Sequence, residues 1–171
     1  MSNTSVDELL ARKAEAVDEI VDVDEPLVKL VIFALDERFF AFKGEFIKEV
    51  IPASEPLFFV PGMPASLQGV INLRGDIESV ILLQGLLQLT GGSESSGGSI
   101  LLGEAAGIRT GIRVDRLLDV VDLPESLLQA TPESLPEALQ PYVDALFEFQ
   151  GKAVTLLDLE KVLDAYQQGW G

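Results

Sequence analysis

The sequence contains no cysteine and no histidine, and each absence excludes a class of functional site. Without cysteine, the chain has no disulfide, no thiol nucleophile and no thiolate metal ligand. Without histidine, it lacks the usual proton shuttle, the commonest transition-metal ligand and any phosphohistidine. We therefore predict that the protein is not an enzyme and that it binds neither a cofactor nor a metal ion.

Positive charge is also scarce. The chain has 12 basic and 28 acidic residues, giving a formal net charge of -16. Such a charge disfavours association with nucleic-acid phosphates and anionic lipid headgroups. No apolar run approaches the roughly 18 residues that a membrane span requires, and the N-terminus lacks the features of a signal peptide. We expect a cytoplasmic protein with protein partners, no nucleic-acid partner and no direct membrane insertion.

Two segments differ in composition from the rest. Residues 1–25 are acidic, lack glycine, proline and aromatic residues, and carry apolar residues at helical spacing, which predicts a flexible or helical N-terminal segment. Residues 91–99 consist mainly of glycine and serine and predict a flexible loop. The spacing of Gly92 and Gly97 resembles a phosphate-binding loop, but Gly98 occupies the position where that motif requires lysine.

The remainder is dominated by short runs of β-branched and aromatic residues separated by turn residues. These runs predict strands at 27–35, 39–42, 46–51, 69–73, 77–82, 99–102, 108–114, 143–149 and 153–157. A short helix is expected at 83–89, and a C-terminal helix at 159–168 with Asp158 as its N-cap. We expect an all-β domain over residues 26–171, with two similar halves divided near residues 90–98.

An enzyme, the less favoured alternative, would have to rely on carboxylates. Asp115 with Asp119, or Asp76 with Glu78, could in principle act as acid and base in a hydrolase. Spacings of two or four residues in a strand more commonly reflect a solvated face. A structure in which the carboxylates do not converge in a pocket would argue against this hypothesis.

The most informative stretch runs from Gly69 to Gly75, where Asn72 and Arg74 interrupt an apolar strand. Arginine is common both in structural ion pairs and at interface hot spots. Arg74 could therefore fasten the end of a barrel or bind an acidic or amide group of a partner. The residues alone leave both roles open.

The order of several motifs resembles the CheW family of chemotaxis coupling proteins and the homologous regulatory domain of CheA kinases. The resemblance covers about residues 27–165. It is carried by the segments 30–33, 39–42, 47–51, 60–64, 69–75, 111–115 with 119–120, and 156–163.

This resemblance implies two SH3-like, five-stranded β-barrel subdomains with short helices, following the acidic N-terminal segment and ending in the C-terminal helix. It implies a non-catalytic adaptor that couples the cytoplasmic tips of chemoreceptors to a CheA-type histidine kinase. The residues expected to face the receptor are Ile47, Glu49 and Arg74. Kinase contact is expected on the other barrel, within about residues 90–140. The residues expected to maintain the fold are Gly69, Asn72, Gly75, Asp115 and Asp158.

The sequence departs from the family pattern shortly after Arg74. Ser79 replaces the usual proline, and Leu82 replaces the usual aspartate. An edge strand tolerates either residue at the first position, whereas the second change removes a carboxylate. A diverged regulator of another receptor–kinase pathway, such as gliding or twitching, is therefore the alternative function. In a further variant of this hypothesis, the acidic segment 1–25 contacts a partner.

Overall fold

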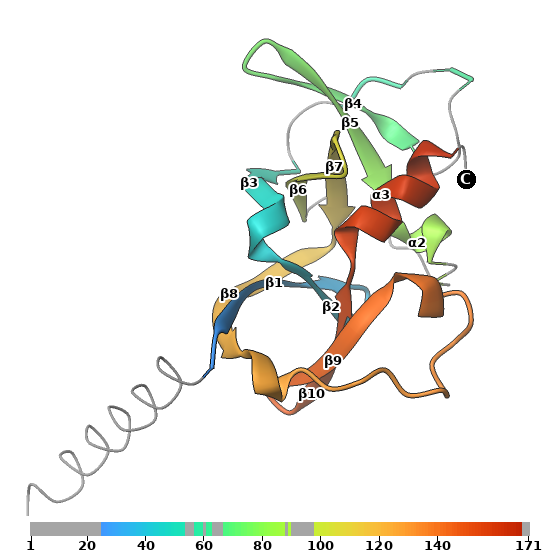
Figure 1. Cartoon of the computed structure of the whole chain (residues 1–171). Coiled ribbons are helices and arrows are strands. Elements are labelled where there is room, and N and C mark those ends of the chain that lie inside the picture. The colour runs from blue at the N-terminus through green and yellow to red at the C-terminus, as the bar shows by residue number, and fades with distance from the viewer. Residues whose placement is uncertain are drawn as a thin grey trace, which may run out of the picture.

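Most of the chain is described by the computed structural model. The described residues are 25–53, 57–59, 61–62, 67–87, 89 and 98–168. The predicted helix in residues 1–25 and most of the glycine- and serine-rich segment 91–99 lie outside these ranges. The described part forms two β-barrels with a helix along one side (Figure 1).

The first barrel is a five-stranded sheet with the order β8-β1-β2-β10-β9. Its strands are β1 (Leu27–Leu35), β2 (Arg38–Lys43), β8 (Arg116–Pro124), β9 (Val143–Phe149) and β10 (Lys152–Leu157). All neighbours are antiparallel except β2 and β10, which are parallel. A bridge between Gln129 and Leu146 connects the segment after β8 to the opposite edge strand, β9.

The second barrel is a five-stranded sheet with the order β3-β6-β7-β5-β4. Its strands are β3 (Ile47–Pro52), β4 (Leu67–Leu73), β5 (Asp76–Leu82), β6 (Ser99–Ala105) and β7 (Ile108–Val114). Here β5 and β7 are the parallel pair. Phe58 bridges to Val70 of the edge strand β4, so the segment after β3 again links the two edges.

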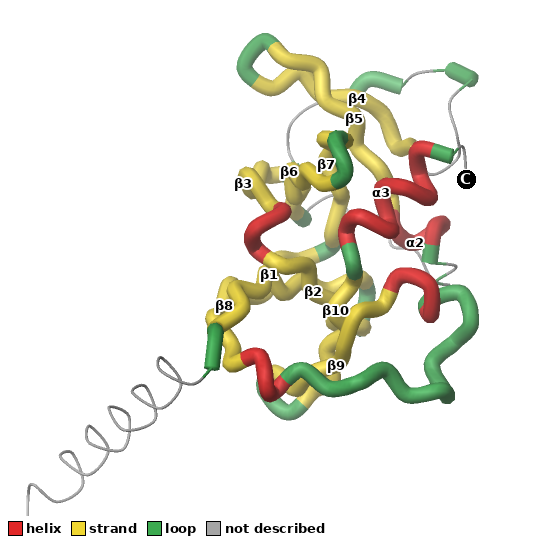
Figure 2. Tube along the Cα trace, viewed as in Figure 1, coloured by secondary structure: helices red, strands yellow, loops and turns green. Residues whose placement is uncertain are grey.

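The two sheets are not consecutive halves of the chain. All five strands of the second barrel lie between β2 and β8 of the first, so the boundary expected near residues 90–98 does not separate the barrels. β6 and β7 follow that boundary but pair with β3 and β5. Local turn residues identified the hairpins, whereas the parallel pairs join strands far apart in sequence and leave no local pattern. Figure 2 shows the resulting arrangement of strands around each barrel.

A shared apolar core holds the barrels together. It contains Phe33, Phe40 and Phe42 of the first barrel, with the Phe33 ring 6.0 Å from that of Phe40 and 5.3 Å from that of Phe42. Leu101 and Ile112 of the second barrel pack into the same cluster. Each barrel also has its own smaller core. The nearly continuous apolar run in β1 follows from this arrangement, because alternate residues of β1 enter the shared core and the core of the first barrel.

The helices are short. Among the described residues, the α-helices are α2 (Leu83–Leu86) and α3 (Leu159–Gln167), and the 3-10 turns are η2 (Gly44–Phe46), η3 (Glu125–Leu127) and η4 (Gln140–Tyr142). α3 begins after β10 and packs against β6 of the second barrel, burying Leu159, Val162 and Leu163 in the shared core. None of the helices in the described ranges is long and apolar enough to cross a bilayer.

Asp158 is the N-cap of α3, and replacing it measures how much the cap contributes to stability. Its Oδ1 accepts hydrogen bonds from the amides of Glu160 at 3.0 Å and Lys161 at 3.3 Å. We expect Asp158→Ala to lower the free energy of unfolding by about 1 kcal/mol, whereas Asp158→Asn retains most of it because asparagine also caps helices. Urea unfolding followed by circular dichroism measures both. Equal stability of the alanine and asparagine variants would contradict a capping role.

Candidate functional site

Arg74 and Gly75 form the turn between β4 and β5. Both have positive φ angles, 52° and 92°, and Leu73 pairs directly with Asp76 on either side of them. Two successive left-handed residues define a type I′ hairpin, for which glycine is favoured at the second position. Asn72 stabilises the turn, because its Oδ1 accepts a hydrogen bond from the amide of Gly75 at 3.0 Å. The turn therefore fixes the backbone from which the Arg74 side chain extends.

The Arg74 guanidinium binds the carboxylate of Glu49 in a bidentate ion pair. Nη1 lies 2.9 Å from Oε2, and Nη2 lies 2.5 Å from Oε1. Glu49 belongs to β3 and Arg74 follows β4, so the pair joins the two edge strands of the second sheet. The Arg74 side chain is nevertheless 65% exposed. The geometry thus matches the structural role considered for Arg74 and leaves much of its guanidinium accessible.

A bulge in β3 separates Ile47 from Glu49. Glu49 pairs with Leu102, whereas Ile47 pairs with the next residue, Gly103, so the register shifts between them. Paired residues of an antiparallel sheet share a face, and consecutive residues lie on opposite faces. Ile47 accordingly packs against the shared core and is partly buried there. The structure brings together two of the three residues expected to face a partner, Glu49 and Arg74, and places Ile47 on another face.

A second ion pair lies close to the first. Arg109 Nε of β7 is 3.1 Å from Oε2 of Glu78 in β5. The hydrogen bonds from Arg74 hold the pKa of Glu49 below its usual value, partial desolvation opposes them, and the positive charge of Arg109 lowers the pKa further. Two arginines and two glutamates therefore form one charged rim at an end of the second barrel. We call Glu49, Arg74, Glu78 and Arg109 the charged rim.

Exposed apolar side chains also occur on the second barrel. Phe59 is 79% exposed, Ile77 63%, Phe58 56% and Val50 40%. Val50 adjoins Glu49, Ile77 pairs with Asn72, and Phe58 bridges to β4. None of the four was predicted from the sequence, although a pair of phenylalanines within a proline-rich loop was an available indication. Val50 and Ile77 are the strand neighbours of Glu49 and Glu78 and therefore lie on the opposite faces of their strands from these glutamates. The second barrel thus carries exposed apolar side chains in addition to the charged rim.

Close backbone packing accounts for a glycine at position 69. A Cβ atom there would lie 2.9 Å from the carbonyl oxygen of Phe58, which accepts the amide hydrogen of Val70. Asp115 lies elsewhere, at the boundary of the two barrels. Its Oδ2 accepts the amide hydrogen of Asp36, a turn residue with a positive φ of 59°.

Ser79 and Leu82, the two departures from the family pattern, lie in β5. Ser79 Oγ is 2.5 Å from Oγ1 of Thr110, which is fully buried, and the Thr110 hydroxyl also donates a hydrogen bond to the carbonyl oxygen of Ser79 at 3.2 Å. Leu82 is half-buried opposite Arg113. The serine hydroxyl therefore provides a polar link between β5 and β7 that a proline could not make.

The carboxylates considered for catalysis serve separate contacts. Glu78 pairs with Arg109, Asp115 binds the amide of Asp36, and Asp119 accepts the amide hydrogen of Val120. Asp76 is exposed beside the β4–β5 turn. These side chains do not converge on a common pocket, so the geometry does not support a hydrolase that uses them.

The fold and the charged rim define a two-barrel, all-β scaffold with a surface suited to protein binding. The CheW-like domain model matches residues 29–167, and the chain belongs to this family. It is 29% identical over 136 residues to the chemotaxis protein CheW of Thermotoga maritima, covering 80% of this chain and 87% of that protein. It is 26% identical to the chemotaxis protein CheW of Bacillus subtilis, covering 80% and 86%.

A solved structure has the same fold. The crystal structure of the scaffolding protein TtCheW from Thermoanaerobacter tengcongensis matches with a TM-score of 0.68 and 24% sequence identity, covering 77% of this chain and 88% of that one. The expected all-β fold with two SH3-like, five-stranded barrels is thus confirmed.

The ionisation of Glu49 tests the electrostatics of the rim. A lowered pKa means that the stabilisation from the ion pair is present above the pKa of Glu49 in the unfolded chain and is lost as the pH falls through its folded value. We expect Arg74→Asn to raise the pKa of Glu49 toward its ordinary value, because the hydrogen bonds are removed. Titration of the Glu49 side-chain carbon by NMR measures this. An unchanged titration midpoint would show that Arg74 does not govern the carboxylate in solution.

Proposed function

We propose that the protein is a non-catalytic, cytoplasmic adaptor that couples chemoreceptors to a CheA-type histidine kinase. The exposed bidentate pair between Glu49 and Arg74, on a barrel that also carries exposed apolar side chains, is the observation that carries the proposal. Membership of the CheW-like family supports the same role. The rim would contact the cytoplasmic tip of the receptor.

The exposure of the ion pair favours a binding role in addition to a structural one. Exposed ion pairs contribute little to stability, because water and salt screen them and side-chain entropy opposes them. Arginine carries five N–H donors, and the two hydrogen bonds to Glu49 leave others free for a partner. The fixed turn and the ion pair also restrict the Arg74 side chain before binding, which reduces the entropic cost of docking.

Residues 90–140, the range expected to contact the kinase, belong to both barrels. The range includes β6 and β7 of the second barrel and β8 of the first. The expectation that it forms the other barrel was wrong, because the chain returns to the first barrel only at β8. We propose that the kinase regulatory domain contacts the first barrel, leaving the charged rim to the receptor.

A diverged regulator of a different receptor–kinase pathway is the second candidate function. The polar link through Ser79 and the half-buried Leu82 favour it, because they stand where the family usually has proline and aspartate. Binding measured in parallel to receptor tips from chemotaxis and from gliding or twitching systems would separate the two functions.

Arg74→Asn tests the receptor-binding role without disturbing the turn. Asparagine followed by glycine is strongly favoured in type I′ turns, whereas alanine at this positive φ would add strain. We expect about tenfold weaker binding to a receptor cytoplasmic fragment, in the range of an interface hot spot, with an unchanged circular dichroism spectrum. Surface plasmon resonance measures the affinity.

Arg116→Asn is the matched control, because Arg116 is an exposed arginine on β8 of the first barrel. It should bind the receptor fragment as the unmodified chain does. Equal affinity of Arg74→Asn and the unmodified chain would refute the proposed role of the rim. Binding of the chain to neither the receptor fragment nor the kinase regulatory domain would refute the adaptor function.

A further inference from the structure

The two barrels correspond residue by residue across their parallel strand pairs. Leu156 lies opposite Ala41 in the first barrel, and Val80 lies opposite Gly111 in the second. Ala41 and Gly111 lie the same number of positions after the turns of their hairpins, and Leu156 and Val80 likewise share one offset from theirs. The preceding pair is therefore equivalent as well, so that Thr155 with Phe40 in the first barrel corresponds to Ser79 with Thr110 in the second.

A helix covers this position in the second barrel. Tyr166 of α3 packs against the shared core, and Thr110 is fully buried. Burial raises the pKa of the Tyr166 hydroxyl, and the neighbouring Ser79 side chain opposes this rise. α3 follows β10, and the helix in the corresponding position after β5 is α2. Because α2 has four residues and α3 has nine, the part of the chain that the structure describes supplies no equally long helix for the first barrel.

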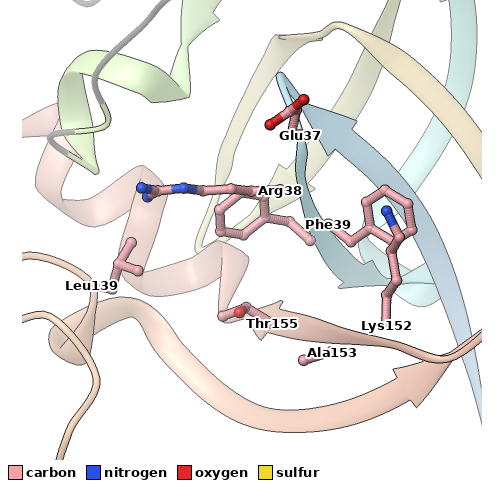
Figure 3. A pocket seen from close by; sticks show the side chains of 8 residues that line it. Glu37, Arg38, Phe39, Leu139, Lys152, Ala153 and Thr155 are labelled. Atoms are coloured by element: carbon pink, nitrogen blue, oxygen red, sulfur yellow. The ribbon is translucent and has the colours of Figure 1, made fainter.

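The equivalent position in the first barrel is an open cavity of about 390 Å³. Phe40 and Thr155 lie in its lining, together with Leu139, Phe39 and Ala153 (Figure 3). Phe40 and Leu139 are almost completely buried, and the more accessible part of the lining is Phe39, Ala153 and Thr155, which is apolar apart from one hydroxyl. Its composition therefore suits an aromatic ring with a polar end.

Two cations and one carboxylate, Glu37, line the cavity (Figure 3). The Arg38 side chain extends toward Leu139, and the Lys152 ammonium lies 5.1 Å from the centre of the Phe39 ring. Within the described residues, neither cation makes an ion pair, although Lys43, Arg74 and Arg109 do. The lining is therefore net positive on a chain whose net charge is -16, and this local positive charge beside an apolar cavity is complementary to an acidic segment.

We propose that this cavity binds an acidic segment of a partner protein through one tyrosine side chain. The ring occupies the space over Phe40 and Leu139, and the hydroxyl hydrogen-bonds Thr155, in the position that corresponds to Tyr166 beside Ser79 in the second barrel. Carboxylates on either side of the tyrosine bind Arg38 and Lys152. The site lies on the first barrel and involves no residue of the charged rim, so it is independent of receptor binding at Arg74.

A short fluorescein-labelled peptide with a central tyrosine flanked on both sides by glutamates tests the proposal by fluorescence anisotropy. We expect saturable binding that weakens as the salt concentration rises, because exposed charges are screened. Arg38→Gln and Lys152→Gln should each weaken binding about tenfold, as expected for loss of a charge-assisted contact. Arg116→Gln is the control for the loss of one exposed positive charge and should have no effect.

Two further comparisons separate binding in the cavity from general attraction. A peptide with alanine in place of tyrosine should bind at least about tenfold more weakly, and Ala153→Phe should block binding by filling the cavity. The absence of saturable binding to the unmodified chain would overturn the proposal. So would equal binding of the tyrosine and alanine peptides, or undiminished binding by both the Arg38→Gln and Lys152→Gln variants.

Discussion

The apolar core shared by the two barrels is the constraint on which the rest of the structure depends. Phe33, Phe40 and Phe42 pack there against Leu101 and Ile112 of the second barrel. α3 adds its own buried face, fastened by the Asp158 cap. Because protein interiors are close-packed, the barrels cannot move relative to each other without opening this cluster. The surfaces at the barrel ends are therefore held at fixed positions on one scaffold.

The charged rim depends on that rigidity and on local backbone geometry. The type I′ turn and the Asn72 hydrogen bond orient Arg74, while the bulge in β3 turns Glu49 toward it and Ile47 toward the shared core. The resulting ion pair closes the edges of the second sheet while remaining exposed. A structural role and a binding role are thus compatible in the same side chain. The first barrel repeats the topology without this rim, which permits a different surface at its corresponding end.

The sequence predicted local features well. Alternation and turn residues located every described strand except β8 (Arg116–Pro124), and the acidic residue before the last apolar stripe identified the Asp158 cap. The division of the chain into barrels was predicted wrongly, because β10 pairs with β2 across a long sequence separation that no local pattern records. The contact between Glu49 and Arg74, which are 25 residues apart, likewise could not be predicted from local sequence. Ile47 was grouped with Glu49 by the resemblance to the CheW family, and the bulge in β3 places the two side chains on different faces. The correspondence between the open cavity at Thr155 and the covered position at Ser79 follows only from the strand registers of the two barrels.

We propose that the charged rim is a docking surface in addition to an ion-pair link between the edge strands. The change in the ¹H–¹⁵N NMR spectrum of the chain on addition of a receptor cytoplasmic fragment tests this role. We expect the largest shifts at Glu49, Arg74, Glu78 and Arg109 and on the strands that carry them. Saturable binding with the largest shifts confined to other surfaces, and with these four amides unmoved, would contradict it.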